Sequence, residues 1–288
     1  MEMTMQLTQQ KTTPVISTKK RTLEYTATMA KKNKGKMVQV PKGYTRIAGS
    51  SFKNMARIRE VQLPKGVSSI GENAFEGCVL LMEVNLPETL NEIGQAAFMG
   101  CGKMKRMTLP DQVEFIRNRS FKNCKDLKTI DLPEGLRVIE KNAFLGCESL
   151  ESVVVPEKVD HIAFRTFYGC KKLEDITLPS GIQSIEREAF VFCGMKRLQL
   201  PQGLSYIGES AFAKCKQLQE IVIPQSVERI DKWAFHGCAS LKKVYFEGNP
   251  KVIGDWIFNK NTVQVYCEKN AEVDRYCDRF EYQRSYIG

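Results

Sequence analysis

The stretch LKTIDLPEGLRVIEKNAFLGC, residues 127–147, decides the fold, because close copies of it recur along the 288-residue chain. The copies are spaced 23 residues apart, with a single step of 22, as their prolines show: Pro41, Pro64, Pro87, Pro110, Pro133, Pro156, Pro179, Pro201 and Pro224. A phenylalanine follows each proline by eleven residues, and in eight consecutive units a cysteine follows three residues later. Units of this length cannot bury an apolar face alone, so they are expected to stack into a solenoid.

Each unit contains two extended pieces and one compact piece. Ile130 and Leu132 lie two residues apart, which predicts a strand with one face inward, and Pro133 ends that strand because it lacks an N–H donor. The segment 136–139 predicts a second short extended piece, and the spacing of Ala-Phe-x-x-Cys predicts one or two helical turns. The predicted fold is an α/β repeat solenoid of about ten turns, with stacked parallel strands, short extended segments and short helices.

The unit L-x-x-I-x-L-P…I-x-x-x-A-F-x-x-C resembles the leucine-rich repeats of the BspA-like family over about residues 37–267. The resemblance implies a curved or twisted solenoid with a parallel sheet, and it implies binding or adhesion, not catalysis. Members of that family are often exported and displayed at the cell surface. This sequence departs from that pattern, because its first thirty residues contain no apolar segment of the secretory type.

The chain is expected to divide into a basic flexible tail over residues 1–36, a solenoid over 37–262 and a capping segment over 263–288. The net charge is +10, and the tail carries eight cations minus two glutamates, or +6: Lys11, Lys19, Lys20, Arg21, Lys31, Lys32, Lys34 and Lys36 against Glu2 and Glu24. Such a tail could contact nucleic acid or an anionic membrane surface, or it could act only as a solubilising arm.

The capping segment is expected to end in a helix that covers the last turn. Asn270 is its predicted N-cap, and an apolar stripe at helical spacing follows: Val273, Tyr276, Cys277 and Phe280. A helix in that place would shield the open edge of the solenoid.

The ten cysteines admit four interpretations. Zinc binding is disfavoured because no C-x-x-C pair occurs, and a disulfide ladder is disfavoured because side chains in one slot point the same way. Eight copies of one inward slot also make a poor catalytic site. The interpretation that remains is a small buried side chain in each turn, with the state of Cys267 and Cys277 left open.

No catalytic residue, cofactor or metal is expected. The two histidines, His161 and His236, occupy slots that accept many residue types, and the sequence contains no phosphate-binding glycine loop and no triad. No apolar run approaches the roughly 18 residues of a membrane span. The expected location is the cytoplasm, and the alternative is the cell surface or secretion by an unrecognised route.

The main candidate for binding is the exposed face of the first strand, formed by the residues that flank its central apolar position. The predicted partner-binding residues are Glu60, Gln62, Glu83, Asn85, Arg106, Thr108, Thr129, Asp131, Ser152, Asp175, Thr177, Arg197, Gln199, Glu220, Lys243 and Tyr245, with Val154 and Val222 in the same rows. A polar face of mixed sign suits a protein partner with matching charges, or it is simply a solvated sheet.

A second candidate is an aromatic face beyond the proline corner, made by Phe115, His161, Phe164, Tyr206 and Trp233. Exposed aromatic residues serve interfaces as hot spots, although these could equally pack against neighbouring turns. The leading hypothesis is a non-enzymatic scaffold that binds a protein through its strand face. The alternatives are an adhesin of the BspA-like type, or association with nucleic acid or membrane through the basic tail.

Overall fold

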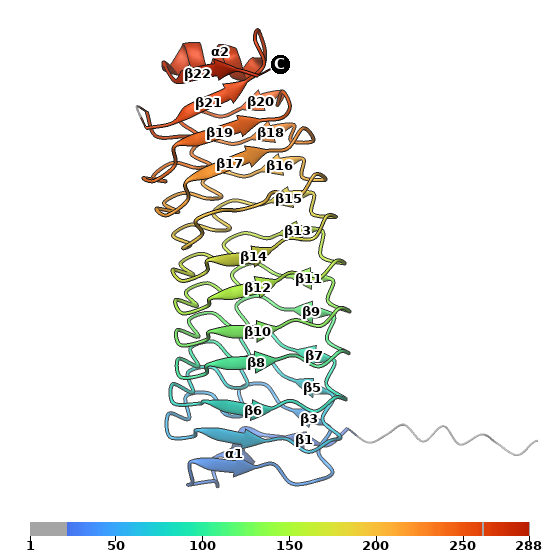
Figure 1. Ribbon diagram of the computed structural model, residues 1–288. Coiled ribbons are helices and arrows are strands. Elements are labelled where there is room, and N and C mark those ends of the chain that lie inside the picture. The colour runs from blue at the N-terminus through green and yellow to red at the C-terminus, as the bar shows by residue number, and fades with distance from the viewer. Residues whose placement is uncertain (1–21, 261, 288) are drawn as a thin grey trace, which may run out of the picture.

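The computed structural model describes residues 22–260 and 262–287, and these form a parallel-strand solenoid of about eleven turns (Figure 1). The predicted solenoid of stacked parallel strands is therefore confirmed. Each regular turn contributes one strand to a main row and one two-residue strand to a second row, and the two rows run side by side along the stack.

The main row contains β2 (Met37–Gln39), β4 (Glu60–Gln62), β6 (Glu83–Asn85), β8 (Arg106–Thr108), β10 (Thr129–Asp131), β12 (Ser152–Val154), β14 (Asp175–Thr177), β17 (Glu220–Ile223), β19 (Lys243–Phe246), β21 (Gln264–Cys267) and β22 (Gln283–Tyr286). The second row contains β1 (Glu24–Tyr25), β3 (Arg46–Ile47), β5 (Ser69–Ile70), β7 (Glu92–Ile93), β9 (Phe115–Ile116), β11 (Val138–Ile139), β13 (His161–Ile162), β15 (Ser184–Ile185), β16 (Tyr206–Ile207), β18 (Arg229–Ile230) and β20 (Val252–Ile253).

All strand pairs are parallel, and most join residues 23 positions apart, as Val61 and Val84 show. The main row is not one continuous sheet. It breaks between β6 and β8, and again between β14 and β17, where residues 197–199 of the 22-residue unit form no strand. The one-residue deletion therefore shows up as a local loss of strand pairing.

The compact Ala-Phe-x-x-Cys piece is a series of turns, so the predicted short helices are wrong. Two residues in the left-handed region flank each repeated phenylalanine, as Asn142 (φ 60°) and Gly146 (φ 74°) flank Phe144. A helix needs consecutive right-handed residues, so it cannot pass through this pattern. The backbone N–H of Phe144 instead donates to the carbonyl of Thr166 in the next turn at 2.9 Å.

The repeated phenylalanines form one continuous stack through the core. Neighbouring rings from Phe52 to Phe235 lie 4.9–5.5 Å apart and are parallel within 8°. Tyr25 extends the stack at one end and Phe258 at the other, at 5.6 and 5.7 Å. The phenylalanine rings are fully buried. Since a buried aromatic ring removes 150–250 Å² from water, this ladder supplies a large part of the hydrophobic stabilisation.

Each cysteine of the repeat has a specific partner in the preceding turn. The Cys147 thiol donates to the carbonyl of Phe121 at 3.1 Å, and the other seven make the equivalent contact at 3.0–3.3 Å. All ten cysteines are free and buried, including Cys267 and Cys277. The interpretation of a small buried side chain is confirmed, and the structure adds a hydrogen bond that links successive turns.

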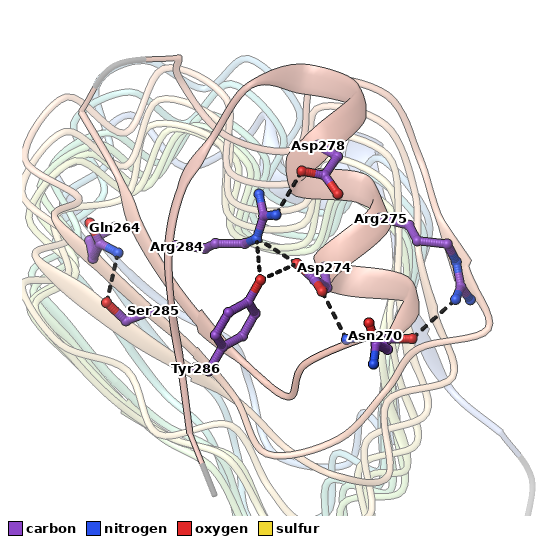
Figure 2. Close-up of polar contacts among 8 residues, drawn as sticks. All are labelled: Gln264, Asn270, Asp274, Arg275, Asp278, Arg284, Ser285 and Tyr286. Carbon is purple, nitrogen blue, oxygen red and sulfur yellow. Dashed lines mark hydrogen bonds and ion pairs between the residues drawn. The ribbon is translucent and has the colours of Figure 1, made fainter.

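The N-terminal end of the described chain differs from the prediction, whereas the C-terminal end has the predicted helix. Residues 22–36, assigned to the tail, contain β1 and helix α1 (Ala27–Ala30), while residues 1–21 lie outside the described part. Helix α2 (Glu272–Phe280) covers the last turn, but its N-cap is Ala271, one residue after the predicted Asn270. The backbone N–H of Asn270 instead donates to Asp274 Oδ2 at 2.8 Å (Figure 2).

A buried ion pair holds the cap together. Asp274 is only 6% exposed, and Arg284 of β22 meets its carboxylate at 2.5 Å and Asp278 at 2.7 Å (Figure 2). Tyr286 lies against the same carboxylate. Because β22 pairs with β21, this network ties the helix to the last strand of the main row.

Replacing a ring in the middle of the stack should be costly. Phe144→Ala is expected to lower the free energy of unfolding by about 3–5 kcal/mol, because it leaves a cavity between two stacked rings. Phe164→Ala removes a half-buried ring outside the stack and should cost about 1–2 kcal/mol. Urea unfolding followed by circular dichroism measures both, and equal losses would contradict a special role for the stack.

Removing the arginine of the cap should unpair a buried carboxylate. Arg284→Met is expected to cost about 1–3 kcal/mol, because Asp274 loses its charged partner without gaining water. The control Arg275→Met breaks an exposed pair with Glu272 and should cost less than about 1 kcal/mol. Thermal unfolding compares the two, and a second change, Asp274→Asn, should recover part of the Arg284→Met loss.

Candidate interaction surfaces

The strand face is built by alternation within each main-row strand. In β12 the central Val153 is buried while Ser152 and Val154 are exposed, and the same pattern recurs along the row. Of the predicted partner-binding residues, all are exposed or half-exposed, but Arg197 and Gln199 lie outside any strand. The face is thus a pair of side-chain rows in register, interrupted where the main row breaks.

A few apolar positions interrupt this otherwise polar face, among them Met37 of β2, which is 61% exposed. Val154 is 67% exposed and Val222 is 40% exposed, both at positions that flank a buried strand centre. At the C-terminal end Tyr245 stacks on Tyr266, with ring centroids 4.5 Å apart. Scattered apolar contact points among charged residues are compatible with recognition of a protein surface.

The predicted aromatic face is largely occupied by cations of the same chain. Arg117 lies 4.7 Å from the Phe115 ring, and Arg165 and Arg187 lie 4.8 and 4.7 Å from the Phe164 ring. Arg117 and Arg165 are close to their rings in the sequence, whereas Arg187 reaches Phe164 from the next turn. The rings of this face are therefore half-buried against cations, which reduces the area that a partner could reach.

The remaining members of the aromatic face have polar partners as well. Tyr206 donates to Asp231 at 2.6 Å, and burial, followed by this carboxylate, raises the pKa of Tyr206 to about 12. His161 lies 2.6 Å from Asp160. Trp233 is 40% exposed in a left-handed conformation (φ 62°), with Lys232 at 4.5 Å from its ring. Trp233 is the most accessible of the five.

The described residues include no group of three or more His, Cys, Asp or Glu side chains that could hold a metal ion. Across the same residues there is also no helix with the length and apolar character of a membrane span. Four cations of the predicted tail, Lys31, Lys32, Lys34 and Lys36, are exposed at the first turn. The other four lie outside the described residues, and contact of the tail with nucleic acid or membrane stays a prediction.

Comparison with known proteins agrees with the repeat geometry. Residues 29–151 and 137–264 match the model of the BspA type leucine rich repeat region, in six copies. The chain belongs to this family. The resemblance predicted from the repeat unit is thereby confirmed.

Some solved structures are similar to this BspA-type solenoid. The leucine-rich repeat protein TpLRR of T. pallidum is 28% identical over 65% of this chain and 79% of its own, with a TM-score of 0.53. The pneumococcal vaccine antigen PcpA is 18% identical over 88% and 79%, also with a TM-score of 0.53, which shows the fold alone. No curated protein matches this chain.

The buried thiols of the BspA-type repeat have low reactivity. Burial raises the pKa of Cys78 and of Cys124 from the usual value of 9.0 to about 12, because a thiolate would lose its hydration. The thiolate is the reactive form of cysteine, so these side chains are poor nucleophiles while the chain is folded.

The raised thiol pKa values predict a loss of stability at alkaline pH. Above about pH 9 the unfolded thiols release protons while the folded ones keep theirs, so rising pH favours unfolding. Stability should be unaffected by thiol ionisation below about pH 8 and should then fall by up to about 1.4 kcal/mol per pH unit for each thiol.

Urea unfolding between pH 7.5 and 10.5, in reducing buffer, measures this slope. Cys147→Ala should have a lower stability at neutral pH but a shallower decline, because it carries one thiol fewer. A stability that stays flat up to pH 10.5 would show that thiol burial does not couple to folding.

Proposed function

We propose that this protein is a non-enzymatic scaffold that binds a protein partner through its strand face. The observation that carries the proposal is the pair of exposed side-chain rows held in register along the main row, with Val154 and Val222 as isolated apolar contact points. The backbone beneath these rows is fixed by parallel pairing and by the phenylalanine stack. A partner that binds a rigid surface need not order it, which favours affinity.

The size and charge of the face also favour a protein partner. The eleven main-row strands of the described chain, at about 4.8 Å from one turn to the next, give a face about 50 Å long, enough for a standard interface of about 1,600 Å². The first residues of the main-row strands form one row of the face. The charge of this row changes sign along the stack, as Glu83, Arg106 and Asp175 show. A phosphate backbone or a lipid surface would select one sign, whereas a protein can match an alternating pattern.

The chemistry of the described residues supports a non-enzymatic role. The nucleophile that recurs in the chain, cysteine, is buried in every copy, and burial raises the pKa of Cys78 and Cys124. Of the two histidines, His161 pairs with an exposed aspartate, and His236 is exposed on a turn. Among the described residues, neither the cysteines nor the histidines place a reactive nucleophile beside a base at the surface.

Charged residues placed on the strand face should abolish partner binding. The double variant Val154→Glu, Val222→Glu is expected to lose at least about tenfold in affinity, because a partner would bury both carboxylates without counter-charges. The control Val79→Glu changes a valine that is 49% exposed on a turn after Cys78, away from the strands, and should bind normally.

The partner is first captured from a lysate with the full chain, then purified and titrated against the variants by calorimetry. Matching circular dichroism spectra establish that each variant is folded. Absence of any saturable partner, or equal loss in the Val79→Glu control, would refute the proposal.

A further inference from the structure

The main row opens between β6 and β8. Backbone pairing joins β2, β4 and β6, and separately β8, β10, β12 and β14, but no pair in the described chain joins β6 to β8. The second row is interrupted in the same place, between β7 and β9. The two turns thus separate along the main row, whereas β7 and β9 stay in contact without pairing; the second row also lacks pairing between β11 and β13.

The third side of the same two turns stays closed. The N–H groups of Ala96 and Phe98 donate across to Asn118 and Ser120, each at 2.9 Å. The Cys124 thiol reaches the Phe98 carbonyl at 3.2 Å, and the Phe98 and Phe121 rings remain 5.5 Å apart. The opening is therefore a wedge whose closed side is the phenylalanine stack.

Between the two turns lies an open groove with a volume of about 1150 Å³. It is lined by residues between 82 and 91 on one side and by residues 105–112 on the other. We call it the β6–β8 groove. Its lining combines apolar side chains, including Val84, Leu86 and Met107, with charged side chains at both ends. The central position of β8 is Met107, where neighbouring strands carry valine or isoleucine. Methionine has a lower strand preference and adapts its shape to what it contacts.

The groove also exposes main-chain groups that are paired in adjacent turns. Met82 N–H donates to Arg59 O at 2.8 Å, and Lys128 N–H donates to Lys105 O at 2.8 Å. The corresponding bond from Lys105 N–H to Met82 O is absent from this part of the described chain. An open strand edge is a template for another strand.

We propose that the β6–β8 groove binds an extended peptide segment of a partner protein, which adds to the open strand edge parallel to its neighbours. This inference rests on the proposed function and narrows it to one place and one form of partner. The strand edge would supply main-chain hydrogen bonds, and the apolar lining would receive alternate side chains of the peptide.

Charge defines the peptide further. The groove begins beside two cations and one carboxylate, Lys105, Arg106 and Glu83, and ends beside Glu88 and Asp111, and all five side chains are exposed. None of the ion pairs in the described chain involves them. A parallel peptide that complements this order carries acidic residues first, alternating apolar residues next and basic residues last.

A designed probe tests the proposal directly. The fluorescein-labelled peptide DEVTITVKK should bind the full chain saturably in an anisotropy titration. The reversed-charge peptide KKVTITVDE, and a DEVTITVKK peptide N-methylated at alternate residues, should both bind at least about tenfold more weakly. N-methylation removes the main-chain donors but keeps the side chains, so it separates strand pairing from simple apolar adhesion.

The chain offers a matched control for charge. Glu88 and Asp111 directly follow the proline of their units, and Glu134 and Glu157 occupy the same slot in the next two turns, also exposed. The variant Glu88→Lys, Asp111→Lys should weaken DEVTITVKK at least about tenfold and strengthen KKVTITVDE. The variant Glu134→Lys, Glu157→Lys carries the same change in net charge and should bind as the unaltered chain does.

Amide hydrogen exchange reports on the open edge itself. In the free full chain Lys105 N–H should exchange faster than Lys128 N–H, and it should slow when DEVTITVKK is added. Slow exchange at Lys105 without peptide would overturn the proposal, since the groove would then be closed or filled by another segment of this chain or by a second copy. Absence of saturable binding, or equal effects of the two charge variants, would overturn it as well.

These outcomes are separable from those of the proposed function. Val154 and Val222 lie outside the groove lining, so the variant Val154→Glu, Val222→Glu should still bind the peptide. Loss of the partner in that variant, together with no peptide binding by the unaltered chain, would leave the scaffold function standing and remove the groove.

Discussion

The stack of phenylalanine rings is the constraint on which the rest of the molecule depends. Each ring fixes the distance between two turns at about 5 Å, close to the natural spacing of hydrogen-bonded strands, so the strand rows can pair beside it. The left-handed residues on either side of each ring, and the thiol that reaches back to its carbonyl, hold the ring in place. Where strand pairing fails, between β6 and β8, the stack and the hydrogen bonds of the turns beside it keep successive turns together.

Much of this architecture can be predicted from the sequence, because a given position of the repeat has the same surroundings in every turn. The buried phenylalanines and cysteines, the exposed residues that flank each strand centre and the apolar stripe of α2 all follow from periodicity. The turns in place of helices were harder to predict. Asn142 and Gly146 tolerate a left-handed backbone, but Arg165 and Glu188 occupy the same conformation and give no such signal. In those units the repeat geometry overrides the local preference.

Other features depend on contacts between segments that no spacing rule connects. Arg187 covers Phe164 from the next turn, and Arg284 meets Asp274 only because β22 returns to pair with β21. The opening beside β8 could not be predicted from the sequence, because the 23-residue spacing is unchanged there. Accordingly, the strand face could be outlined from the sequence, whereas the groove within it could not.

The thiol ladder has a consequence for how this protein must be made. Eight cysteines in equivalent slots become equivalent again when the chain unfolds, and eight thiols can combine into 105 different sets of disulfides. None of these sets is compatible with a fold that needs every thiol free. Folding therefore has to finish before oxidation begins. Disulfides that form in an unfolded molecule would keep it from refolding.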